Sequence, residues 1–297
     1  MKAGKSLTRA ALKQFPLPAI VDGDKETKGR ILIIAGCREL AGAALLVANA
    51  AMRSGAGKLR MATVESVAIG TSLAMPEAMV LGFEEARDGG FTKTAVRRLR
   101  EEADRSDVVV AGPGMATAAT CEALASGLLR SPAAVVLDAA LLHSLKPLDE
   151  AKRGSDALPV LLPHAGELAS LLDCGEEHVA ADPIGCGLQA ATRYHANVLV
   201  KGVTSHVVTP DGRAWSFSGG APGLGVSGSG DTLAGIVGGL IARGADSLTA
   251  LLWAVLLHGE VGEALARRIG PIGFLARQIP DEIPALLTAA SGGSDRP

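Results

Sequence analysis

Residues 30–54 read RILIIAGCRELAGAALLVANAAMRS, which predicts a buried strand followed by an Ala-rich helix. The stretch 30–35 is a short apolar run dominated by isoleucine, as expected for a strand that is covered on both faces. Over 42–54 the small and apolar residues are instead typical of a helix. A strand and a helix joined in this way are the repeating unit of an α/β fold built on a parallel sheet.

The same alternation continues along the chain. Residues 205–217 predict a hairpin, because Pro210, Asp211 and Gly212 supply turn residues in its middle. We therefore expect an α/β fold with a central, mostly parallel sheet that is flanked by helices. Further strands are expected at 58–63, 78–82, 107–111, 133–138, 159–162 and 197–201, and the last helices at 231–243, 248–268 and 283–289.

No internal repeat or long linker divides the sequence, so we expect a single domain over residues 28–290. Residues 1–27 are expected to form an N-terminal extension, and the small, polar residues 291–297 a flexible tail. Both ends are expected to be loose, because chain ends are poorly ordered unless something ties them down.

The composition excludes several classes of function. The 297 residues include 29 Lys and Arg against 31 Asp and Glu, a net charge of −2, so no nucleic-acid partner is expected. The apolar runs at 232–242 and 247–257 are shorter than the about 20 residues that cross a bilayer, so no membrane association is expected either. No secretory signal is evident, which favours a cytoplasmic location. The cysteines lack zinc-ligand or C-x-x-C spacing and are expected to be reduced thiols: Cys37, Cys121, Cys174 and Cys186.

A glycine-rich stretch at 219–230, GGAPGLGVSGSG, runs directly into Asp231 and an apolar helical pattern. So many glycines before a helix favour a close approach of the backbone to a ligand. We expect the N–H groups of Gly228, Ser229 and Gly230, at the positive end of a helix, to bind a phosphoryl group. A tight turn, with Asp231 as a helix cap, is the alternative.

Polar or glycine-rich turns also follow three of the predicted strands. They are Gly112-Pro113-Gly114, the stretch 162–167 (LPHAGE), and Lys201-Gly202. Because parallel strands end at one edge of a sheet, these turns are expected to meet the start of the 231–243 helix in a ligand-binding crevice. His164 could instead only cap the next helix, and Lys201 could only extend its ammonium group to solvent. His258 lies in an apolar helical stretch and is expected to pack in the core, with Gly259 allowing a close contact.

Taken in order, these segments resemble the NAD(P)H-hydrate dehydratases of the ribokinase-like superfamily. The resemblance covers about residues 28–288, and the whole ordered set is more specific than any one motif. Its members are KG (28–29), AGCRELAGA (35–43), GPG (112–114), PHAGE (163–167), KG (201–202), PDG (210–212), PGLGVSGSGD (222–231) and LHGEVGEALA (257–266).

The resemblance implies a reaction in which hydrated NADH or NADPH is returned to NADH or NADPH. The ring hydroxyl is phosphorylated by ADP, or by ATP, and the phosphate is then eliminated, with Mg²⁺ as cofactor. It implies Asp231 as the general base, Glu167 in the Mg²⁺ shell, and a homo-oligomer. The positions matching dinucleotide contacts are Gly42, Ala43, Gly114, His164 and Asp231. Those matching nucleotide contacts are Lys201, Gly202, Val203, Thr204, Ser205, Gly228, Ser229 and Gly230.

The sequence departs from the family pattern at three places. In the stretch 221–231, Leu224, Gly225, Val226 and Ser227 are substituted, although Gly228, Gly230 and Asp231 remain. Ala35, Cys37 and Leu40 stand where the family has Gly, Ser and Tyr, and Ala140 stands where it has a second carboxylate after Asp138. The epimerase domain fused to many bacterial members is absent from the sequence, so a stand-alone dehydratase is expected. Two other functions remain open: a small-molecule kinase of the same superfamily, and a non-catalytic nucleotide-binding protein.

Overall fold

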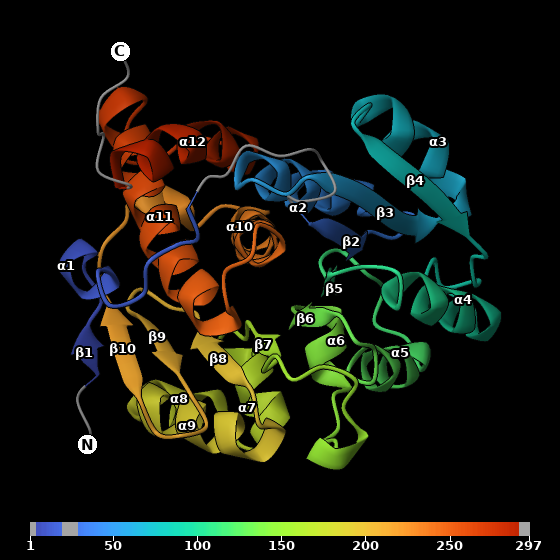
Figure 1. Ribbon diagram of the computed structural model, residues 1–297, viewed down its shortest axis with the longest axis horizontal. Coiled ribbons are helices and arrows are strands. Elements are labelled where there is room, and N and C mark those ends of the chain that lie inside the picture. The colour runs from blue at the N-terminus through green and yellow to red at the C-terminus, as the bar shows by residue number, and fades with distance from the viewer. Residues whose placement is uncertain (1–3, 20–28, 291–297) are drawn as a thin grey trace.

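The computed structural model describes residues 4–19 and 29–290, and within them one ten-stranded sheet organises the fold (Figure 1). The strands are β1 (Lys5–Ser6), β2 (Arg30–Ile34), β3 (Lys58–Val64), β4 (Ala78–Phe83), β5 (Val108–Ala111), β6 (Ala134–Leu137), β7 (Val160–Leu161), β8 (Asn197–Val200), β9 (Ser205–Val208) and β10 (Ala214–Phe217). Their order across the sheet is β1-β10-β9-β8-β7-β6-β5-β2-β3-β4.

Neighbouring strands are parallel except where β9 is involved. β9 is antiparallel to both β8 and β10, with Val208 opposite Val198 on one side and Ala214 on the other. The turn between β9 and β10 contains Gly212, whose N–H donates to the carbonyl of Thr209 at 3.0 Å. The predicted mostly parallel sheet and the predicted hairpin are both confirmed.

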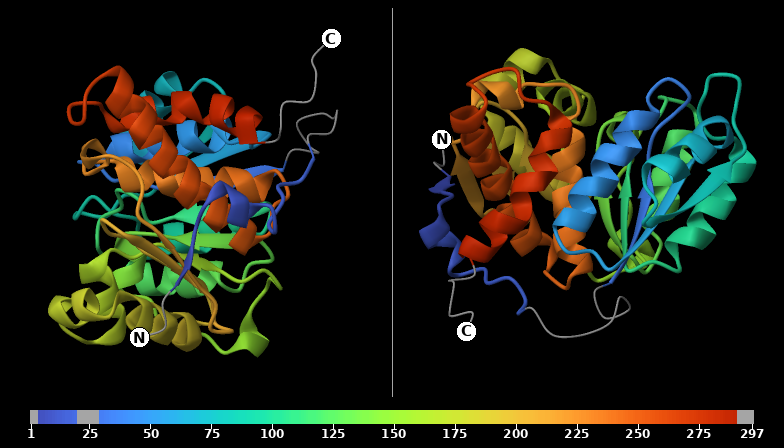
Figure 2. Two further views of the ribbon diagram at one scale, coloured as in Figure 1. Left: turned by 90° about the vertical axis from the view of Figure 1, so that its left-hand side faces the viewer. Right: turned by 90° about the horizontal axis from the view of Figure 1, so that it is seen from above.

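Helices cover both faces of the sheet (Figure 2). They are α1 (Arg9–Leu12), α2 (Ala41–Arg53), α3 (Glu65–Ala74), α4 (Lys93–Ala103), α5 (Thr120–Leu128), α6 (Ala140–His143), α7 (Ala165–Leu172), α8 (Glu176–Ala181), α9 (Pro183–Tyr194), α10 (Ser229–Ala242), α11 (Ser247–Arg268) and α12 (Ile279–Ala290), with 3₁₀ turns η1 (Glu150–Lys152), η2 (Pro222–Leu224) and η3 (Ala276–Gln278).

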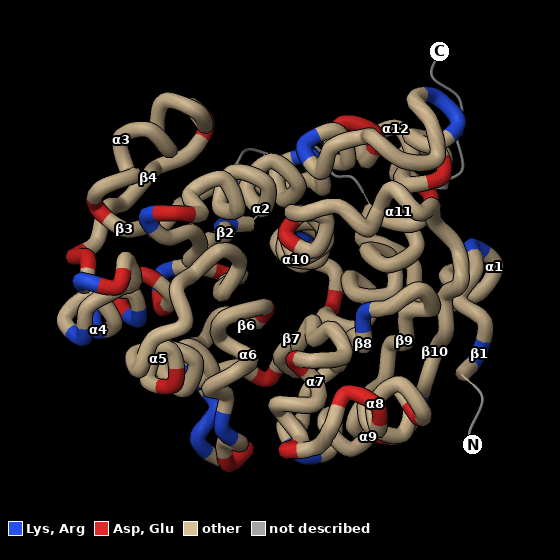
Figure 3. The backbone as a smooth tube through the Cα atoms, turned by 180° about the vertical axis from the view of Figure 1, so that it is seen from behind, with Lys and Arg blue, Asp and Glu red and all other residues tan. Residues whose placement is uncertain are grey.

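Successive residues of the central strands pack into two separate hydrophobic cores, one on each face of the sheet, because side chains alternate between the faces of a strand. Ile31 and Ile33 of β2 pack with α2, α10, α11 and α12, whereas Leu32 and Ile34 pack with α4, α5, α7 and α9. Most of α10 is buried, which explains why its sequence is apolar on all sides. Helix α4 carries both Lys and Arg and, in its last turn, Glu (Figure 3), as expected for a solvated helix face.

The segment 4–19 is not loose, and that part of the expectation is wrong. β1 pairs in parallel with β10, and Leu7 and Leu12 are buried. Arg9 pairs with Glu260 of α11 at 2.6 Å, and the indole N–H of Trp253 donates to the carbonyl of Phe15 at 2.7 Å. The missed pairing is non-local and leaves no periodicity in the segment itself. Residues 20–28 and the predicted flexible tail 291–297 lie outside the described residues, and the domain limits stay a prediction.

Helix α11 is longer than its apolar run suggests. Its 22 residues would be long and apolar enough to cross a membrane, but 78% of its most apolar window is buried inside the protein. It packs against α10, α12 and the strands β7, β8 and β9. Trp253 is buried within it, and Trp215 of β10 is also buried, so both tryptophans pack in the core.

Candidate active site

A lysine and two carboxylates form a buried cluster at the carboxyl edge of the sheet. Lys201 follows β8, Asp138 follows β6, and Glu167 lies in the first turn of α7. The Lys201 ammonium (Nζ) is 2.7 Å from Asp138 Oδ1 and 3.7 Å from Glu167 Oε2, and the carboxylate side chains are only 3% and 6% exposed. Burial lowers the pKa of Lys201, but the charges of Asp138 and Glu167 outweigh this effect and raise it. Lys201 therefore stays charged in the interior.

Asp231 lies beside this cluster in the first turn of α10. The pKa of its carboxyl group is raised from 3.8 to about 6, because burial and the charge of Asp138 together outweigh the opposing charge of Lys201. A carboxylate with a pKa near working pH is suited to accepting a proton. The predicted general base is thus in an environment that fits the role.

The backbone of Asp138 is in close contact with the loop after β5. Gly112 has φ +117°, and a Cβ atom at this residue would collide with the carbonyl oxygen of Asp138. Only glycine has both the conformational freedom and the small size that this position requires. The GPG turn therefore contributes to the position of the carboxylate that holds Lys201.

The start of α10 differs in one respect from the predicted anion site. The N–H of Ser229 donates to the carbonyl of Val226 at 3.1 Å, so this predicted phosphate donor already has a partner within the preceding turn. The N–H groups of Gly230 and Asp231 lie in the first helical turn, where no helical carbonyl accepts from them. A Cβ atom on Gly230 would be 3.8 Å from Lys201 Nζ. The helix start and the ammonium group therefore face the same space.

His258 has a more specific role than the core packing that was expected. Its Nε2 lies 3.0 Å from the hydroxyl and 3.1 Å from the carbonyl oxygen of Ser229, which joins α11 to the first residue of α10. Burial and the charge of Lys201 lower the pKa of His258 to about 4 despite the opposing hydrogen bond to the Ser229 carbonyl, so the ring is neutral at physiological pH. Gly259 does allow a close contact, because a Cβ atom there would collide with the ring of Phe217.

His164 and Glu167 form a capping box at the start of α7. The ring Nδ1 of His164 accepts from the N–H groups of Gly166 and Glu167 at 3.1 and 3.4 Å, and the N–H of His164 donates to Glu167 Oε2 at 2.8 Å. The capping alternative for His164 is therefore real, although its side chain is 58% exposed at the rim of the site.

Both carboxylate oxygens of Glu167 already contact His164, which limits how Glu167 could hold the predicted Mg²⁺. One oxygen accepts from the N–H of His164, and the other lies 3.3 Å from its Nε2. Over residues 4–19 and 29–290, no three His, Cys, Asp or Glu side chains gather as a ready-made metal site. The available carboxylates fit only a Mg²⁺ held mainly by phosphates and water, which is the usual arrangement for a nucleotide-bound Mg²⁺.

A cavity of about 900 Å³ opens beside the cluster. His164, Lys201, Ser229, Gly230 and His258 are among the residues that line it. Most of the predicted nucleotide-binding residues line it, including Gly202, Val203 and Ser205. Thr204 instead pairs with Ser218 through their hydroxyl groups at 3.1 Å. The glycine-rich stretch expected to approach a ligand also lines it, from Gly219 to Gly230. Sequence reasoning missed the lining residues outside that stretch, Phe217, Ser218, Leu233 and Val255.

The predicted dinucleotide contacts gather at a neighbouring place, around the start of α2. A Cβ atom on Gly114 would collide with that of Ala43, and the N–H of Gly36 donates to the carbonyl of Pro113 at 2.9 Å. A Cβ atom on Gly42 would have no other heavy atom within 4 Å. Gly228 lies between this region and α10, since a Cβ atom on it would collide with Leu46 of α2. The two groups of predicted residues therefore meet at the start of α10.

The residues that depart from the family pattern occupy different environments. Leu40 is 58% exposed at the start of α2, whereas Ala35 and Cys37 are buried. Ala140 is also buried, at 5% exposure. Because Ala140 has no carboxylate, Asp138 is the one acidic residue of the stretch 138–140, and it pairs with Lys201.

Comparisons with known proteins agree with this geometry. A family model described as NAD(P)H-hydrate dehydratase matches residues 31–285. The chain is 46% identical over 284 residues to an ADP-dependent (S)-NAD(P)H-hydrate dehydratase of Xanthomonas campestris, covering 95% of this chain and 96% of that protein. It is also 36% identical to a bifunctional NAD(P)H-hydrate repair enzyme of Gloeobacter violaceus. The match covers 92% of this chain but only 52% of that protein, so this chain spans about half its length.

Solved structures give the same result at the level of the fold. The Bacillus subtilis ADP/ATP-dependent NAD(P)H-hydrate dehydratase, co-crystallised with ATP and Mg²⁺, superposes with a TM-score of 0.82 at 25% identity, covering 97% of this chain and 99% of that one. A ribokinase-like superfamily protein of Enterococcus faecalis gives 0.80 at 22% identity over 97% and 96% of the two chains, which bears on the fold alone. The family match over most of the chain and the 46% identity establish membership, and this chain belongs to the NAD(P)H-hydrate dehydratase family.

Proposed function

We propose that this chain converts hydrated NADH or NADPH back to NADH or NADPH, using ADP as the phosphoryl donor, with ATP as the alternative donor. The observation that carries the proposal is the position of Asp231, a carboxylate with a pKa of about 6, beside Lys201 and at the start of α10. A proton acceptor, a fixed cation and free helix N–H groups then surround one point. Phosphoryl transfer requires this combination.

The reaction divides into two steps that use the same place. Asp231 accepts the proton of the ring hydroxyl as its oxygen bonds to the terminal phosphorus, and the bond from that phosphorus to the rest of the nucleotide breaks. The carbon–oxygen bond then breaks, phosphate leaves, and loss of a ring proton restores the double bond. Phosphate is a far better leaving group than hydroxide, which explains why a kinase-like fold serves a dehydration.

The surrounding residues would bind the two substrates on either side of Asp231. We infer that the 900 Å³ cavity holds the adenine nucleotide, with Lys201, Gly202, Val203 and Ser205 along it. Its phosphates would then meet the N–H groups of Gly230 and Asp231. The region of Gly42, Ala43 and Gly114 would hold the hydrated dinucleotide, with His164 at the rim between them.

Magnesium would bind together with the nucleotide. Asp138 and Glu167 are the carboxylates that would hold it through water, and it would supply charge neutralisation to the phosphates. Lys201 already neutralises part of this cluster, so the residues alone provide only a partial metal site.

The direct experiment is to incubate the pure protein with hydrated NADH and either ADP or ATP, and to follow the return of NADH absorbance. Recovery that requires a nucleotide supports the proposal, and the faster nucleotide identifies the donor. A phosphorylated product without recovery of NADH would instead indicate a small-molecule kinase. Nucleotide binding without any turnover would indicate a non-catalytic relative.

We also propose that the protein works in the cytoplasm as a homo-oligomer. Apolar side chains on α3 and β4 support association, because Ile69, Leu73 and Met79 are 78%, 81% and 58% exposed. Light scattering of the wild type and of Leu73→Asp tests this, since the charged variant should shift towards the monomer.

A further inference from the structure

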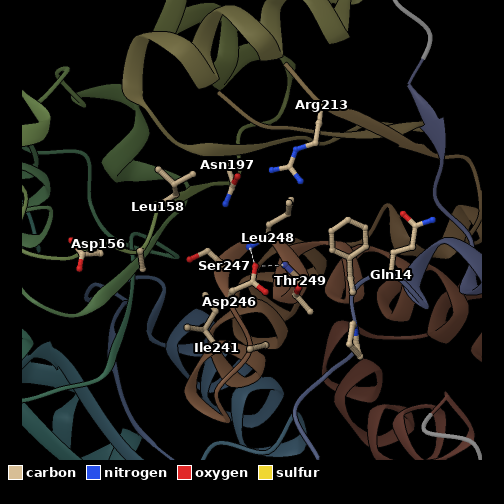
Figure 4. Close-up of a pocket in the computed structure, with 14 residues that line it drawn as sticks. Gln14, Asp156, Leu158, Asn197, Arg213, Ile241, Asp246, Ser247, Leu248 and Thr249 are labelled. Carbon is tan, nitrogen blue, oxygen red and sulfur yellow. Dashed lines mark hydrogen bonds between the residues drawn. The ribbon is translucent and has the colours of Figure 1, made fainter. Parts of the chain in front are cut away.

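Helix α11 borders two cavities along its length. Its first turn lines a cavity of about 640 Å³, where Asp246 Oδ1 accepts from the N–H groups of Leu248 and Thr249 at 3.0 Å each (Figure 4). Further along, His258 and Gly259 line the 900 Å³ cavity that we assign to the nucleotide. Most of the helix is buried as well as capped, so it is a fixed support for the wall of that second cavity.

The second half of α11 presents one face to the nucleotide cavity. Residues three and four positions apart share a face of a helix, and the stretch 257–266 (LHGEVGEALA) places two glycines and two polar side chains in this way. A Cβ atom on Gly262 would collide with Leu224, which lines the cavity, just as one on Gly259 would collide with Phe217. The residues of this face are His258, Gly259, Gly262 and Glu263.

Glu263 binds the backbone of the glycine-rich wall. Its Oε1 accepts from the N–H of Gly220 at 3.2 Å, although the two residues are 43 positions apart in sequence. Gly220 has φ +108° and follows another glycine, so the free chain has many conformations at this point. Arg267 lies 3.9 Å from the other carboxylate oxygen, Oε2, which leaves Oε1 to Gly220.

The carboxylate of Glu263 acts on the cavity only through this wall. Among the described residues, Gly219, Gly220 and Ala221 line the cavity and Glu263 does not. The next part of the wall is held separately, because the N–H of Gly223 donates to the carbonyl of Pro271 at 2.8 Å. Loss of the Glu263 contact would therefore release the start of the wall and leave the rest in place.

We propose that Glu263 is a positioning residue for nucleotide binding, which holds residues 219–221 in the conformation that receives ADP. This inference rests on the proposed function, in which the cavity takes the adenine nucleotide. A wall that is already ordered binds more tightly, because the cost of ordering it is not charged against the affinity. Since Glu263 holds the wall and does not contact Asp231, the effect falls on nucleotide affinity and not on kcat.

Calorimetric titration of the full chain with ADP tests this role. Glu263→Ala should weaken ADP binding about three- to tenfold, as expected for the loss of one hydrogen bond to a partly exposed charged group. Glu263→Gln keeps an acceptor oxygen on a side chain of the same length and should bind ADP about as tightly as the wild type. Hydrogen exchange without nucleotide should become faster at 219–221 in the alanine variant alone. In the dehydration assay the KM for ADP should rise with the dissociation constant, while kcat changes little.

A second carboxylate on the same helix provides the matched control. Glu260 pairs with Arg9 at 2.6 Å, so Glu260→Ala should leave ADP binding unchanged even if the melting temperature falls. The proposal is overturned if Glu263→Ala binds ADP as tightly as the wild type or more tightly, or if Glu263→Gln binds as weakly as Glu263→Ala. These titrations contain no hydrated NADH. A wild type that binds ADP but returns no NADH would therefore disprove the proposed function, while the comparison of the variants would still decide the role of Glu263.

Discussion

Lys201 Nζ and Asp138 Oδ1 form a 2.7 Å ion pair that is almost closed to solvent, and this pair fixes the charge beside Asp231. Lys201→Met keeps the length of the side chain but leaves the carboxylates of the cluster without their cation. Removing one partner of a buried pair typically costs about 3–5 kcal/mol of stability. Urea unfolding at pH 7 should show a loss of this size. An unchanged free energy of unfolding would contradict the pairing.

Replacing Asp231 by asparagine should lower the reaction rate but raise the stability at neutral pH. Asp231→Asn cannot accept the hydroxyl proton, so the rate should fall by about 10²- to 10⁴-fold. In the wild type the raised pKa means that stability is lost as pH rises from about 4 to about 6, since ionisation is unfavourable in the folded state. The asparagine variant is therefore expected to melt above the wild type at pH 7 and together with it near pH 3. A near-normal rate would remove Asp231 from the chemistry.

The pH profile of the wild type provides a separate check on the same group. Because the base must be ionised, kcat/KM should rise with pH through a midpoint near 6. Lys201 lowers the pKa of Asp231, so any activity left in Lys201→Met should rise through a higher midpoint. An unchanged midpoint would mean that a group other than Asp231 controls the rise of kcat/KM with pH.

Gly230 tests the anion site without disturbing the fold. A methyl group there meets Lys201 Nζ at an ordinary contact distance, so Gly230→Ala should fold normally and gain up to about 1 kcal/mol from helix propensity. It should raise the KM for the nucleotide by narrowing the space between the helix and Lys201. Gly70→Ala on α3, where a Cβ atom has open space, is the matched control and should gain stability with unchanged kinetics. Equal kinetics in the two variants would remove Gly230 from the phosphate site.

His258 is expected to act by positioning Ser229. His258→Leu removes the contacts at 3.0 and 3.1 Å, so the KM for the nucleotide should rise several-fold while the effect on kcat is smaller. His258→Gln keeps a donor and should recover part of the loss. Because the pKa of His258 is about 4, neither variant should alter the pH profile above pH 5. A shifted profile would instead implicate the ring in proton transfer.

Much of the fold could be predicted because parallel strands are short apolar runs. The strands after 30–54 were all recognisable, and the alternation then implied that their carboxyl ends share one edge. This reasoning correctly brought Lys201, His164 and Gly230 to one cavity. It did not require any knowledge of side-chain contacts.

The sequence could not reveal contacts that depend on packing between distant elements. Asp138 and Lys201 each follow a strand, but their pairing depends on the register across β6, β7 and β8. His258 has apolar neighbours that are typical of a core residue, and only the packing of α11 on α10 brings its ring to Ser229. The N–H of Ser229 was assigned to phosphate because the turn that uses it has no distinctive residue pattern.

The segment 4–19 has a consequence for the way the chain is made. Arg9 and Glu260 are 251 residues apart in sequence, and Phe15 and Trp253 are 238 apart, so the ribosome must produce most of the chain before these contacts can form. Until then β1 is held on the edge of β10 by strand pairing alone, and an edge that opens is a template for aggregation. A chain released before α11 is complete would lack the contacts that hold the segment there. Although this segment is synthesised before the sheet, it is therefore among the last parts of the chain to reach its final place, and a delay in translation beyond residue 217 would prolong the aggregation-prone state.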